Sequence, residues 1–413
     1  MQSSHLFAPL TLPNGSIIRN RIAKAAMEEN MAAPGQLPGS EIQQLYRRWA
    51  EGGSGLLITG NVMIDGRALT GPGGIVLQAG TPLQPFRDWA AAASSHGTQV
   101  WMQLNHPGRQ VFKAMGGNAW APSAVALELG KHSGMFAQPQ AMSEAQIQEV
   151  IRRFADSAAL AEQAGFNGVQ IHAAHGYLLS QFLSPLSNRR TDAWGGDIDK
   201  RARLLLEVVK AVRARVQPQF AVAVKLNSAD FQRGGFDLAD AQRVVALLNQ
   251  LPVDLLELSG GSYEAPAMQG RTADGRTLAR EAYFLDFARD IAAIAHMPVM
   301  TTGGIRRRAV AQTVIDSGVA MVGIGTALAM QPSLLAQWQQ QESHAPQPQV
   351  SWGDKALASL ATMAIVRRQL RRLGKGQAPR PDSSALLSLL CDQLRAHRLT
   401  ARYRRWLAQH AAA

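Results

Sequence analysis

Short apolar runs alternate with longer segments of helical periodicity along most of the chain. Eight runs are short and apolar, as in strands buried on both faces of a parallel sheet: Ile22–Met27, Gly55–Gly60, Gln99–Leu104, Gly168–His172, Ala221–Leu226, Val253–Leu258, Val299–Thr302 and Met321–Ile324. Eight amphipathic segments alternate with them: Ser40–Gly52, Leu83–His96, Ser143–Ala164, Lys200–Val216, Leu238–Leu251, Arg280–Ala295, Arg306–Ser317 and Pro332–Gln341. This alternation predicts a single closed (β/α)8 TIM barrel, and an open doubly wound sheet is the alternative with the same repeat.

Local signals mark several of the predicted helix ends. Ser143 with Gln146 three residues later has the form of a capping box, and Asp237 is a suitable N-cap for the helix after it. Gly165 and Gly318 stand where helices should end, a position that favours glycine.

The composition changes after about Gln341. A polar, proline-rich stretch predicts a linker, and two helical segments with mixed apolar and arginine positions follow it. In order, these are the linker His344–Val350, the helix Lys355–Leu373, a break at Gly374–Ser384 and the helix Ser384–Ala411. We therefore expect a barrel over residues 1–343 and a small, basic helical C-terminal extension over residues 344–413.

Positive charge is concentrated in that extension. The 413-residue chain has a net charge of +12, and residues 354–413 hold twelve Lys and Arg against three Asp and Glu. The rest of the chain is close to neutral, and the extension has no recognised nucleic-acid motif. We expect a helical appendage with a solvated basic face, which caps the barrel or assembles a homo-oligomer rather than binding RNA.

Cysteine content and hydropathy narrow the class of protein. The only cysteine, Cys391, excludes an internal disulfide and any cysteine-rich zinc or iron–sulfur site. No apolar run is long enough to cross a bilayer, and the first residues lack the basic and apolar regions of a secretory signal. With 46% apolar and 17% charged residues the chain reads as a globular protein, and the cytoplasm is the expected compartment.

Polar residues at strand ends carry the candidate chemistry, because barrel active sites form where the βα loops converge. Two of these loops are long, from Asn105 to about Gln140 and from Ala173 to about Asp199. Long loops in compact domains tend to be functional, and these two are rich in Gly, Pro and His. We expect them to cover the barrel mouth.

The strongest cluster lies at the end of the fourth predicted strand, in Ile171-His172-Ala-Ala-His175-Gly-Tyr177. Two imidazoles can hydrogen-bond one developing oxyanion, and a tyrosine on the same loop can deliver a proton. These groups suit a substrate whose electrons move toward a carbonyl oxygen while a nearby carbon is protonated. A helical zinc motif would need His at i and i+4 with an adjacent Glu, so no metal is expected. Two histidines with purely structural hydrogen bonds are the other interpretation.

Two more strand ends carry polar side chains. Gln103 ends the third strand, just before Asn105-His106-Pro-Gly-Arg109. Its side-chain amide can form hydrogen bonds to the edge of a flat heterocycle, with both a donor and an acceptor. Lys225 lies in the apolar run Val222-Ala-Val-Lys225, where burial requires a charged partner. Lys225 would stabilise an anion such as a reduced flavin or a phosphate. A Schiff-base lysine of an aldolase-type or lyase barrel is the alternative.

Two glycine turns follow the last two strands. They are Thr302-Gly303-Gly304-Ile-Arg306 and Gly323-Ile-Gly325-Thr326. Barrels commonly bind phosphate at these two positions through backbone N–H groups. The second turn lacks the third glycine of a dinucleotide fingerprint and lies late in the chain, which argues against a Rossmann domain.

These motifs, in this order, resemble the Old Yellow Enzyme family of FMN-dependent NADH:flavin oxidoreductases, or ene-reductases. The resemblance covers roughly residues 5–340. It begins with Leu6-Phe7-Ala-Pro-Leu, Asn14-Gly and Asn20-Arg21-Ile22, and continues through Gln103-Leu-Asn-His106-Pro-Gly-Arg109. Its most specific parts are His172-Ala-Ala-His175-Gly-Tyr177-Leu-Leu-Ser-Gln181-Phe-Leu-Ser-Pro185 and Asn188-Arg-Arg190-Thr-Asp192-Ala-Trp-Gly195-Gly196.

The resemblance implies a role for each matched residue. His172 and His175 would bind the carbonyl or nitro oxygen of the substrate, and Tyr177 would protonate its α carbon. Gln103 and Lys225 would contact the pyrimidine edge of FMN, with Lys225 stabilising negative charge near N1 and the C2 oxygen. The other implied cofactor contacts are Ala26, Met27, Glu28 and Gly60 at the isoalloxazine ring and Gly303, Gly304, Gly325 and Thr326 at the phosphate.

The implied reaction uses NAD(P)H to reduce non-covalent FMN, and hydride then passes to an electron-poor C=C bond conjugated to a carbonyl or nitro group. Three positions depart from common members of the family. Glu28 stands where many have Thr or Cys beside the flavin, and Lys225 replaces an arginine, which keeps the charge but not the bidentate geometry. Thr326 stands where an arginine often meets the phosphate, so phosphate binding would rest on backbone N–H groups.

Two related classes of flavin barrel are weaker alternatives. Relatives with an iron–sulfur cluster are excluded because the cluster needs several cysteines. An FMN barrel that acts on tRNA uridine, of the dihydrouridine synthase type, normally uses a cysteine of a barrel loop as its acid. The one cysteine here, Cys391, lies outside the predicted barrel.

Overall fold

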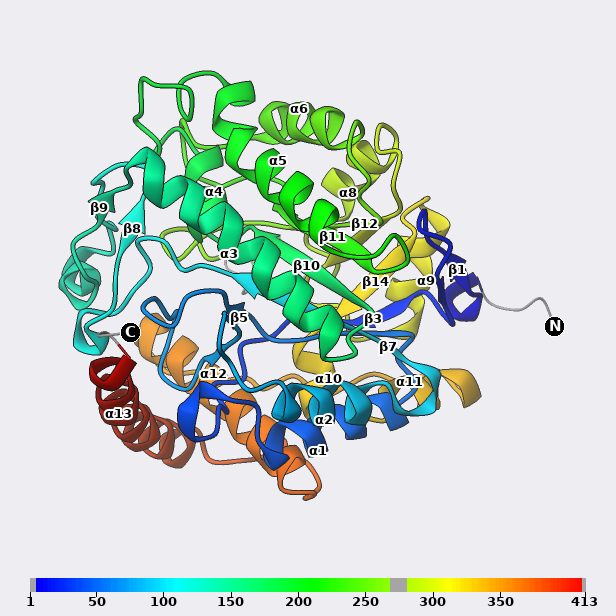
Figure 1. Cartoon of the computed structure of the whole chain (residues 1–413). Helices are drawn as coiled ribbons and strands as arrows, with labels where there is room; N and C mark the ends of the chain where they lie inside the picture. The colour runs from blue at the N-terminus through cyan, green and yellow to red at the C-terminus, as the bar shows by residue number, and fades with distance from the viewer. Residues whose placement is uncertain (1–4, 268–280, 411–413) are drawn as a thin grey trace.

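Eight parallel strands close into a barrel in the computed structural model, which describes residues 5–267 and 281–410 (Figure 1). The strands are β3 (Ile22–Lys24), β4 (Leu56–Ile58), β7 (Gln99–Asn105), β10 (Gly168–Ala173), β11 (Ala221–Asn227), β12 (Leu255–Ser259), β13 (Val299–Thr302) and β14 (Met321–Ile324). Each pairs with the next, and β14 pairs with β3 to close the ring. The predicted closed barrel is confirmed, and the open sheet is wrong because an open sheet has two free edges.

Eight helices follow the barrel strands and surround them. They are α1 (Ser40–Glu51), α2 (Gln84–Ala93), α3 (Glu144–Gln163), α5 (Ile198–Arg215), α6 (Leu238–Leu248), α8 (Leu285–Ala292), α9 (Arg308–Asp316) and α11 (Leu334–Gln340). All eight predicted helices overlap one of these. The predicted start of the sixth, Arg280, lies outside the described residues, and α8 itself is shorter than expected at both of its ends.

The predicted capping signals are confirmed. The Ser143 hydroxyl accepts the Gln146 N–H while the Gln146 side chain accepts the Ser143 N–H, so α3 begins with a capping box. The Asp237 carboxylate accepts the Asp240 N–H at the start of α6. Gly165 and Gly318 follow their helices with φ of 89° and 93°, angles that only glycine adopts without strain.

The sequence pattern missed several short elements in the loops. Two are helices at the barrel mouth, α4 (Leu178–Leu183) and α10 (Thr326–Met330). The others are the two-residue strands β1 (Leu10–Thr11), β2 (Ile17–Ile18), β5 (Val62–Met63), β6 (Ile75–Val76), β8 (Trp120–Ala121) and β9 (Gln140–Ala141). Such elements are too short to show a period in sequence.

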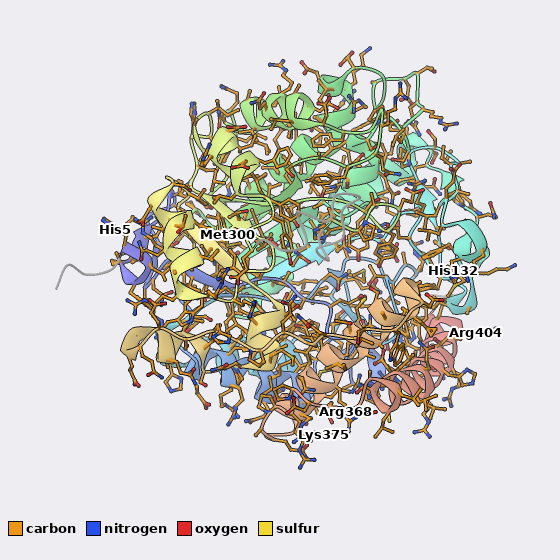
Figure 2. All side chains as sticks on the ribbon, turned by 180° about the vertical axis from the view of Figure 1, so that it is seen from behind. His5, His132, Met300, Arg368, Lys375 and Arg404 are labelled. Atoms are coloured by element: carbon orange, nitrogen blue, oxygen red, sulfur yellow. The ribbon has the colours of Figure 1, made fainter. Side chains whose placement is uncertain are left out.

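Apolar side chains form two separate layers. The larger lies between the strands and the surrounding helices, and a smaller cluster of barrel residues includes Trp101, Leu255 and Met300, which is labelled in Figure 2. Leu10, Leu12 and Ile18 of the β1–β2 hairpin pack with this smaller cluster. The barrel interior is therefore filled at that end, and polar groups gather at the other, where the strands end.

The C-terminal extension packs against the barrel as two helices, α12 (Lys355–Gly374) and α13 (Ala385–His410), which lie side by side in Figure 1 (orange and red). α12 contacts α1 and α10, and Tyr403 of α13 is completely buried. Several basic side chains of the extension are exposed, including Lys375 and Arg404, which are labelled in Figure 2. The last residue of the second predicted helix, Ala411, lies outside the described part of the chain. Among the described helices, none is both long and apolar enough to cross a membrane.

Candidate active site

A cavity of about 540 Å³ opens at the carboxyl ends of the barrel strands. This volume is within the range of small-molecule and cofactor sites, roughly 300–1,000 Å³. Its lining includes nine of the predicted site residues: Ala26, Met27, Glu28, His175, Lys225, Gly303, Gly304, Gly325 and Thr326. The four others, which are Gly60, Gln103, His172 and Tyr177, are not in the lining. One face of α12, in the extension, also lines the cavity.

The two histidines lie where β10 runs into its loop. Their rings are 5.0 Å apart, edge to face, and the His172 ring is 4.9 Å from that of Tyr177. His175 has a φ of 63°, and its backbone N–H donates to the Asn227 side chain, which helps to hold this left-handed conformation. The chain therefore turns sharply after Ala174 and brings three polar rings together at one point.

His172 is buried and His175 is half-buried, and both imidazoles favour the uncharged form. Burial lowers the pKa of His172 and of His175 well below the usual range, and the Lys225 ammonium lowers each further. The Nδ1 of His172 accepts the Ala174 N–H, which places the ring proton on Nε2. The Nε2 of His175 lies 2.8 Å from the Ser259 hydroxyl. Neutral imidazoles in a dry site polarise a carbonyl by donating a hydrogen bond rather than by carrying charge.

Tyr177 is held as a phenol. Burial raises its pKa well above the usual range, and the neighbouring Tyr263 and Glu28 raise it further. Its hydroxyl lies 3.1 Å from the hydroxyl of Tyr263, a residue that the sequence analysis did not single out. A phenol that keeps its proton at neutral pH is available as a general acid.

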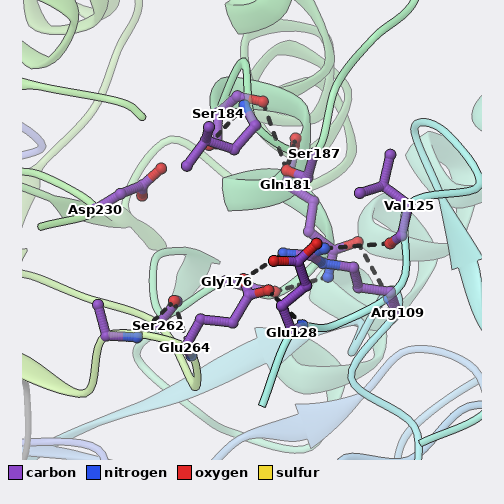
Figure 3. Close-up of polar contacts among 12 residues, drawn as sticks. Arg109, Val125, Glu128, Gly176, Gln181, Ser184, Ser187, Asp230, Ser262 and Glu264 are labelled. Carbon is purple, nitrogen blue, oxygen red and sulfur yellow. Dashed lines mark hydrogen bonds and ion pairs between the residues drawn. The ribbon is translucent and has the colours of Figure 1, made fainter. Parts of the chain in front are cut away.

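A polar network holds the loop that carries Tyr177 (Figure 3). The Gln181 side chain donates to the Gly176 carbonyl and accepts the Arg109 N–H. The Arg109 guanidinium pairs with Glu264 at 2.6 Å, and both side chains are less than a tenth exposed. Because Glu264 follows Tyr263 directly and the Arg109 backbone N–H bonds to Gln181, Arg109 links the two loops that carry the tyrosines.

Lys225 has the charged partner that its burial requires. Its Nζ lies 2.9 Å from Glu257 Oε1, and the two residues are opposite each other in the register of β11 and β12. The other Glu257 oxygen accepts from Gln170, whose own carbonyl accepts from Gln103, each at 2.7 Å. Gln103 is thus joined to Lys225 through a buried chain of three hydrogen bonds, although it does not reach the cavity itself.

Glu28 lies on the cavity wall, and its Oε1 accepts the Thr70 hydroxyl at 2.5 Å. Gly60 is not among the residues that line the cavity. Its N–H donates to Tyr46 and Glu29, in a buried network that also holds Lys24. Burial lowers the pKa of Lys24 to about 8, although Glu29 opposes the shift. This network lies directly behind the β3 end of the cavity and gave no clear signal in sequence.

The two glycine turns line the cavity next to its β3 side, since β14 pairs with β3 and Gly325 lies near Met27. Gly304 has a φ of 71°, which favours glycine, and a Cβ on it would lie 2.4 Å from the Tyr283 hydroxyl, so a larger residue would be strained and would displace that side chain. The turns share this side with Arg306, which pairs with Glu281 at 3.3 Å. Glycines that let the backbone approach a ligand, beside an arginine, form a suitable phosphate site. Glycine turns beside an arginine and a buried lysine, lining one cavity, fit the phosphate and the ring of FMN.

Comparisons with known proteins agree with this geometry. A family model described as "NADH:flavin oxidoreductase / NADH oxidase family" matches residues 5–344. The NADH-dependent flavin oxidoreductase iliE of Neonectria sp. (strain DH2) is 39% identical over 81% of this chain and 47% of its own length. The protein of that name from Hypocrea jecorina (strain QM6a) is 36% identical over 81% of this chain and 88% of its own length. The chain thus spans about half of the first relative and most of the second.

Two solved structures share the fold. The Old Yellow Enzyme homologue from Zymomonas mobilis has a TM-score of 0.72 at 24% identity, over 83% of this chain and 94% of that one. Morphinone reductase has a TM-score of 0.68 at 23% identity, over 83% of this chain and 91% of that one.

The fold and the site define a flavin-dependent oxidoreductase. The chain belongs to the NADH:flavin oxidoreductase / NADH oxidase family, and the resemblance to Old Yellow Enzyme is confirmed. With the family come FMN as cofactor and NAD(P)H as reductant, as predicted.

Proposed function

We propose that this chain reduces the C=C bond of an alkene conjugated to a carbonyl or nitro group. The observation that carries the proposal is the cluster of His172, His175 and Tyr177 at the end of β10, beside a cavity suited to FMN. Bound FMN supplies hydride that it has received from NAD(P)H. The names of the Neonectria and Hypocrea relatives support NADH as that reductant.

In the proposed reaction the histidines act on the substrate's oxygen. Each neutral ring offers one N–H to the carbonyl or nitro oxygen, on which negative charge grows as the β carbon is attacked. Their low pKa keeps this donor set unchanged across neutral pH. Tyr177 then gives its proton to the α carbon, and Tyr263 orients the phenol.

The proposed cofactor contacts follow from the lining of the cavity. Lys225 would stabilise negative charge at the pyrimidine edge of the ring, with Gln103 acting through Gln170 and Glu257. Ala26, Met27 and Glu28 would lie along the ring. The residues that would hold the phosphate are Gly303, Gly304, Gly325 and Thr326.

The structure gives less support to the alternative chemistries. The Glu257 carboxylate stabilises Lys225 as an ammonium ion, whereas a Schiff-base lysine must be neutral to attack a carbonyl. Cys391 is exposed on α13 and does not line the cavity, so it is not in the place of a dihydrouridine synthase acid.

The decisive variant is Tyr177→Phe, which removes the proton donor and keeps the ring. We expect alkene reduction to slow by roughly 100-fold or more, while flavin reduction by NADH changes less than about twofold. Stopped-flow absorbance measures the two half-reactions separately. Tyr263→Phe is the matched control and should have a smaller effect in the same half-reaction. Equal losses in both half-reactions of Tyr177→Phe would exclude this tyrosine as the donor.

A further inference from the structure

One face of α12 forms a wall of the cavity. The residues on it recur every three or four positions, as they must on a single helix face: Ala358, Ser359, Thr362, Met363, Val366, Arg367 and Leu370. The wall is apolar at most of these positions, and Arg367 is its only charged residue. The most basic segment of the chain therefore contributes one guanidinium to the same cavity as His175 and Lys225.

α13 holds that wall in place. Asp392 accepts from the Nη1 of Arg367 at 2.9 Å and from the Nη1 of Arg371 at 2.8 Å. Further along α13, the buried Tyr403 hydroxyl donates to the Gly66 carbonyl at 2.9 Å, and Arg395 donates to the Asn30 carbonyl. Gly66 and Asn30 belong to the loops after β4 and β3. The two helices are thus anchored to the same loops that carry Glu28 and Thr70.

The cations of the cavity differ in how fully they are neutralised. Lys225 pairs with Glu257 at 2.9 Å, whereas Arg306 shares Glu281 with Arg307, at 3.3 Å and 2.7 Å. Arg367 shares the single carboxylate of Asp392 with Arg371. Glu28 is a second carboxylate that acts on Arg367 electrostatically, without an ion pair within 4.0 Å in the described part of the chain, and it is hydrogen-bonded to Thr70. The Arg367 guanidinium has five N–H donors, one of its nitrogens is hydrogen-bonded to Asp392, and the residue lines the cavity.

We propose that Arg367 binds a carboxylate group carried by the alkene substrate, so that the enzyme selects unsaturated acids over the matching neutral esters. This inference rests on the proposed function. A planar guanidinium pairs with a carboxylate through two parallel hydrogen bonds, and exclusion of water strengthens the pair. The net charge of the extension adds a field that draws anions to this side of the barrel. Glu28 opposes this field from the facing wall.

The test compares an α,β-unsaturated carboxylic acid with its methyl ester. In Arg367→Gln, the KM for the acid should rise roughly 10- to 100-fold, and the KM for the ester should change less than about twofold. Glu28→Gln should have the opposite effect to Arg367→Gln, because it removes a negative charge, and should lower the KM for the acid relative to that for the ester. Arg367→Lys keeps the charge without the planar fork and should lie between wild type and Arg367→Gln.

Arg368→Gln is the matched control. Arg368 is the next residue of α12, bonds to Ser388 of α13 at 3.3 Å and does not line the cavity. This variant should leave both KM values within about twofold of wild type. Asp392→Asn should give part of the Arg367→Gln effect, because it loosens the guanidinium without removing it.

A binding measurement separates this inference from the proposed reaction. The saturated analogue of the acid cannot be reduced, and its Kd is read from the visible spectrum of the bound flavin. A Kd that rises at least about tenfold in Arg367→Gln supports the inference even if neither alkene is turned over, which would overturn only the proposed function. Equal effects on acid and ester, or no binding of the saturated acid to wild type, would overturn the inference. So would an increase confined to the Kd of FMN, which would place the guanidinium on the cofactor phosphate.

Discussion

The two walls of the cavity are built in different ways. On the strand-end wall, each polar group is fixed by the barrel itself, since Lys225 and Glu257 are neighbours in register and His172 follows from the same strand as Gln170. On the α12 wall, Arg367 is placed by helices outside the barrel and by one shared carboxylate. We infer that the barrel provides the catalytic groups and that the extension provides selectivity for the substrate. Changes to the strand-end wall should therefore alter the rate of alkene reduction, and changes to the α12 wall should alter the KM for acids.

The largest effect should come from removing both histidines of the strand-end wall. In the double variant His172→Ala/His175→Ala the developing negative charge on the substrate loses both donors. We expect alkene reduction to fall by about 1,000-fold or more, while reduction of the flavin by NADH is nearly unchanged. Single-turnover kinetics with a neutral enone measure this loss, and Arg367→Gln should leave the same rate constant close to wild type. A loss under about tenfold would mean that the histidines are structural.

The ion pairs of the two walls should differ in their contribution to stability. Glu257→Gln leaves Lys225 as an unpaired buried charge, and we expect a loss of about 3–5 kcal/mol in the free energy of unfolding. Asp392→Asn acts on partly exposed arginines and should cost about 1–2 kcal/mol. Urea denaturation of the holoenzyme measures both. Equal costs would contradict the view that only the strand-end wall depends on a buried pair.

Lowering the pH should destabilise the fold through a histidine on the strand-end side of the molecule before it affects the arginines of the α12 wall. Burial lowers the pKa of His106 to about 4, against Asp65, which opposes the shift. In the unfolded chain His106 is protonated below pH about 6.5, and in the folded chain only near pH 4. The contribution of neutral His106 to the free energy of unfolding is therefore fully present above pH about 6.5 and is lost as the pH falls. For His106 alone, the free energy of unfolding should fall by about 3 kcal/mol as the pH drops from about 6.5 to below about 4. In His106→Gln the free energy of unfolding, measured with urea between about pH 4 and pH 6.5, should depend less steeply on pH, by the equivalent of about one bound proton. An unchanged slope would show that the pKa of His106 is the same in the folded and unfolded chain.

The smallest expected effect is on the pH dependence of alkene reduction. The pKa values of His172 and His175 lie well below neutrality and that of Tyr177 lies well above it. The rate of the oxidative half-reaction with a neutral enone should therefore change less than about twofold between about pH 6 and pH 8. A fall on the acid side with an apparent pKa near about 6.5 would mean that an imidazole of ordinary pKa takes part.

Much of the strand-end wall could be predicted from sequence, because the signals are local. Buried parallel strands are short apolar runs, and a polar residue at the end of one, such as Gln103 or His172, stands out. Lys225 stood out for the same reason. Glu257 also interrupts an apolar run, but only the register of β11 and β12 identifies it as the partner of Lys225.

The α12 wall could not be predicted in this way. Its two helices were expected with nearly the observed bounds, but their position depends on contacts between residues far apart in sequence, such as Tyr403 with Gly66. Tyr263 was missed for a related reason, since only the folded loops bring it to Tyr177. A helical period shows which face of α12 is apolar and does not show what that face covers.

The most direct test of the proposed chemistry is an isotope measurement on the wild-type enzyme. The protein is reduced without oxygen by NADH carrying deuterium at its transferable position, and is mixed with a conjugated enone in ordinary water. The account predicts rapid reoxidation of the flavin and a saturated ketone with deuterium at the β carbon and solvent hydrogen at the α carbon. Reoxidation by oxygen alone, with the enone recovered unchanged, would contradict it.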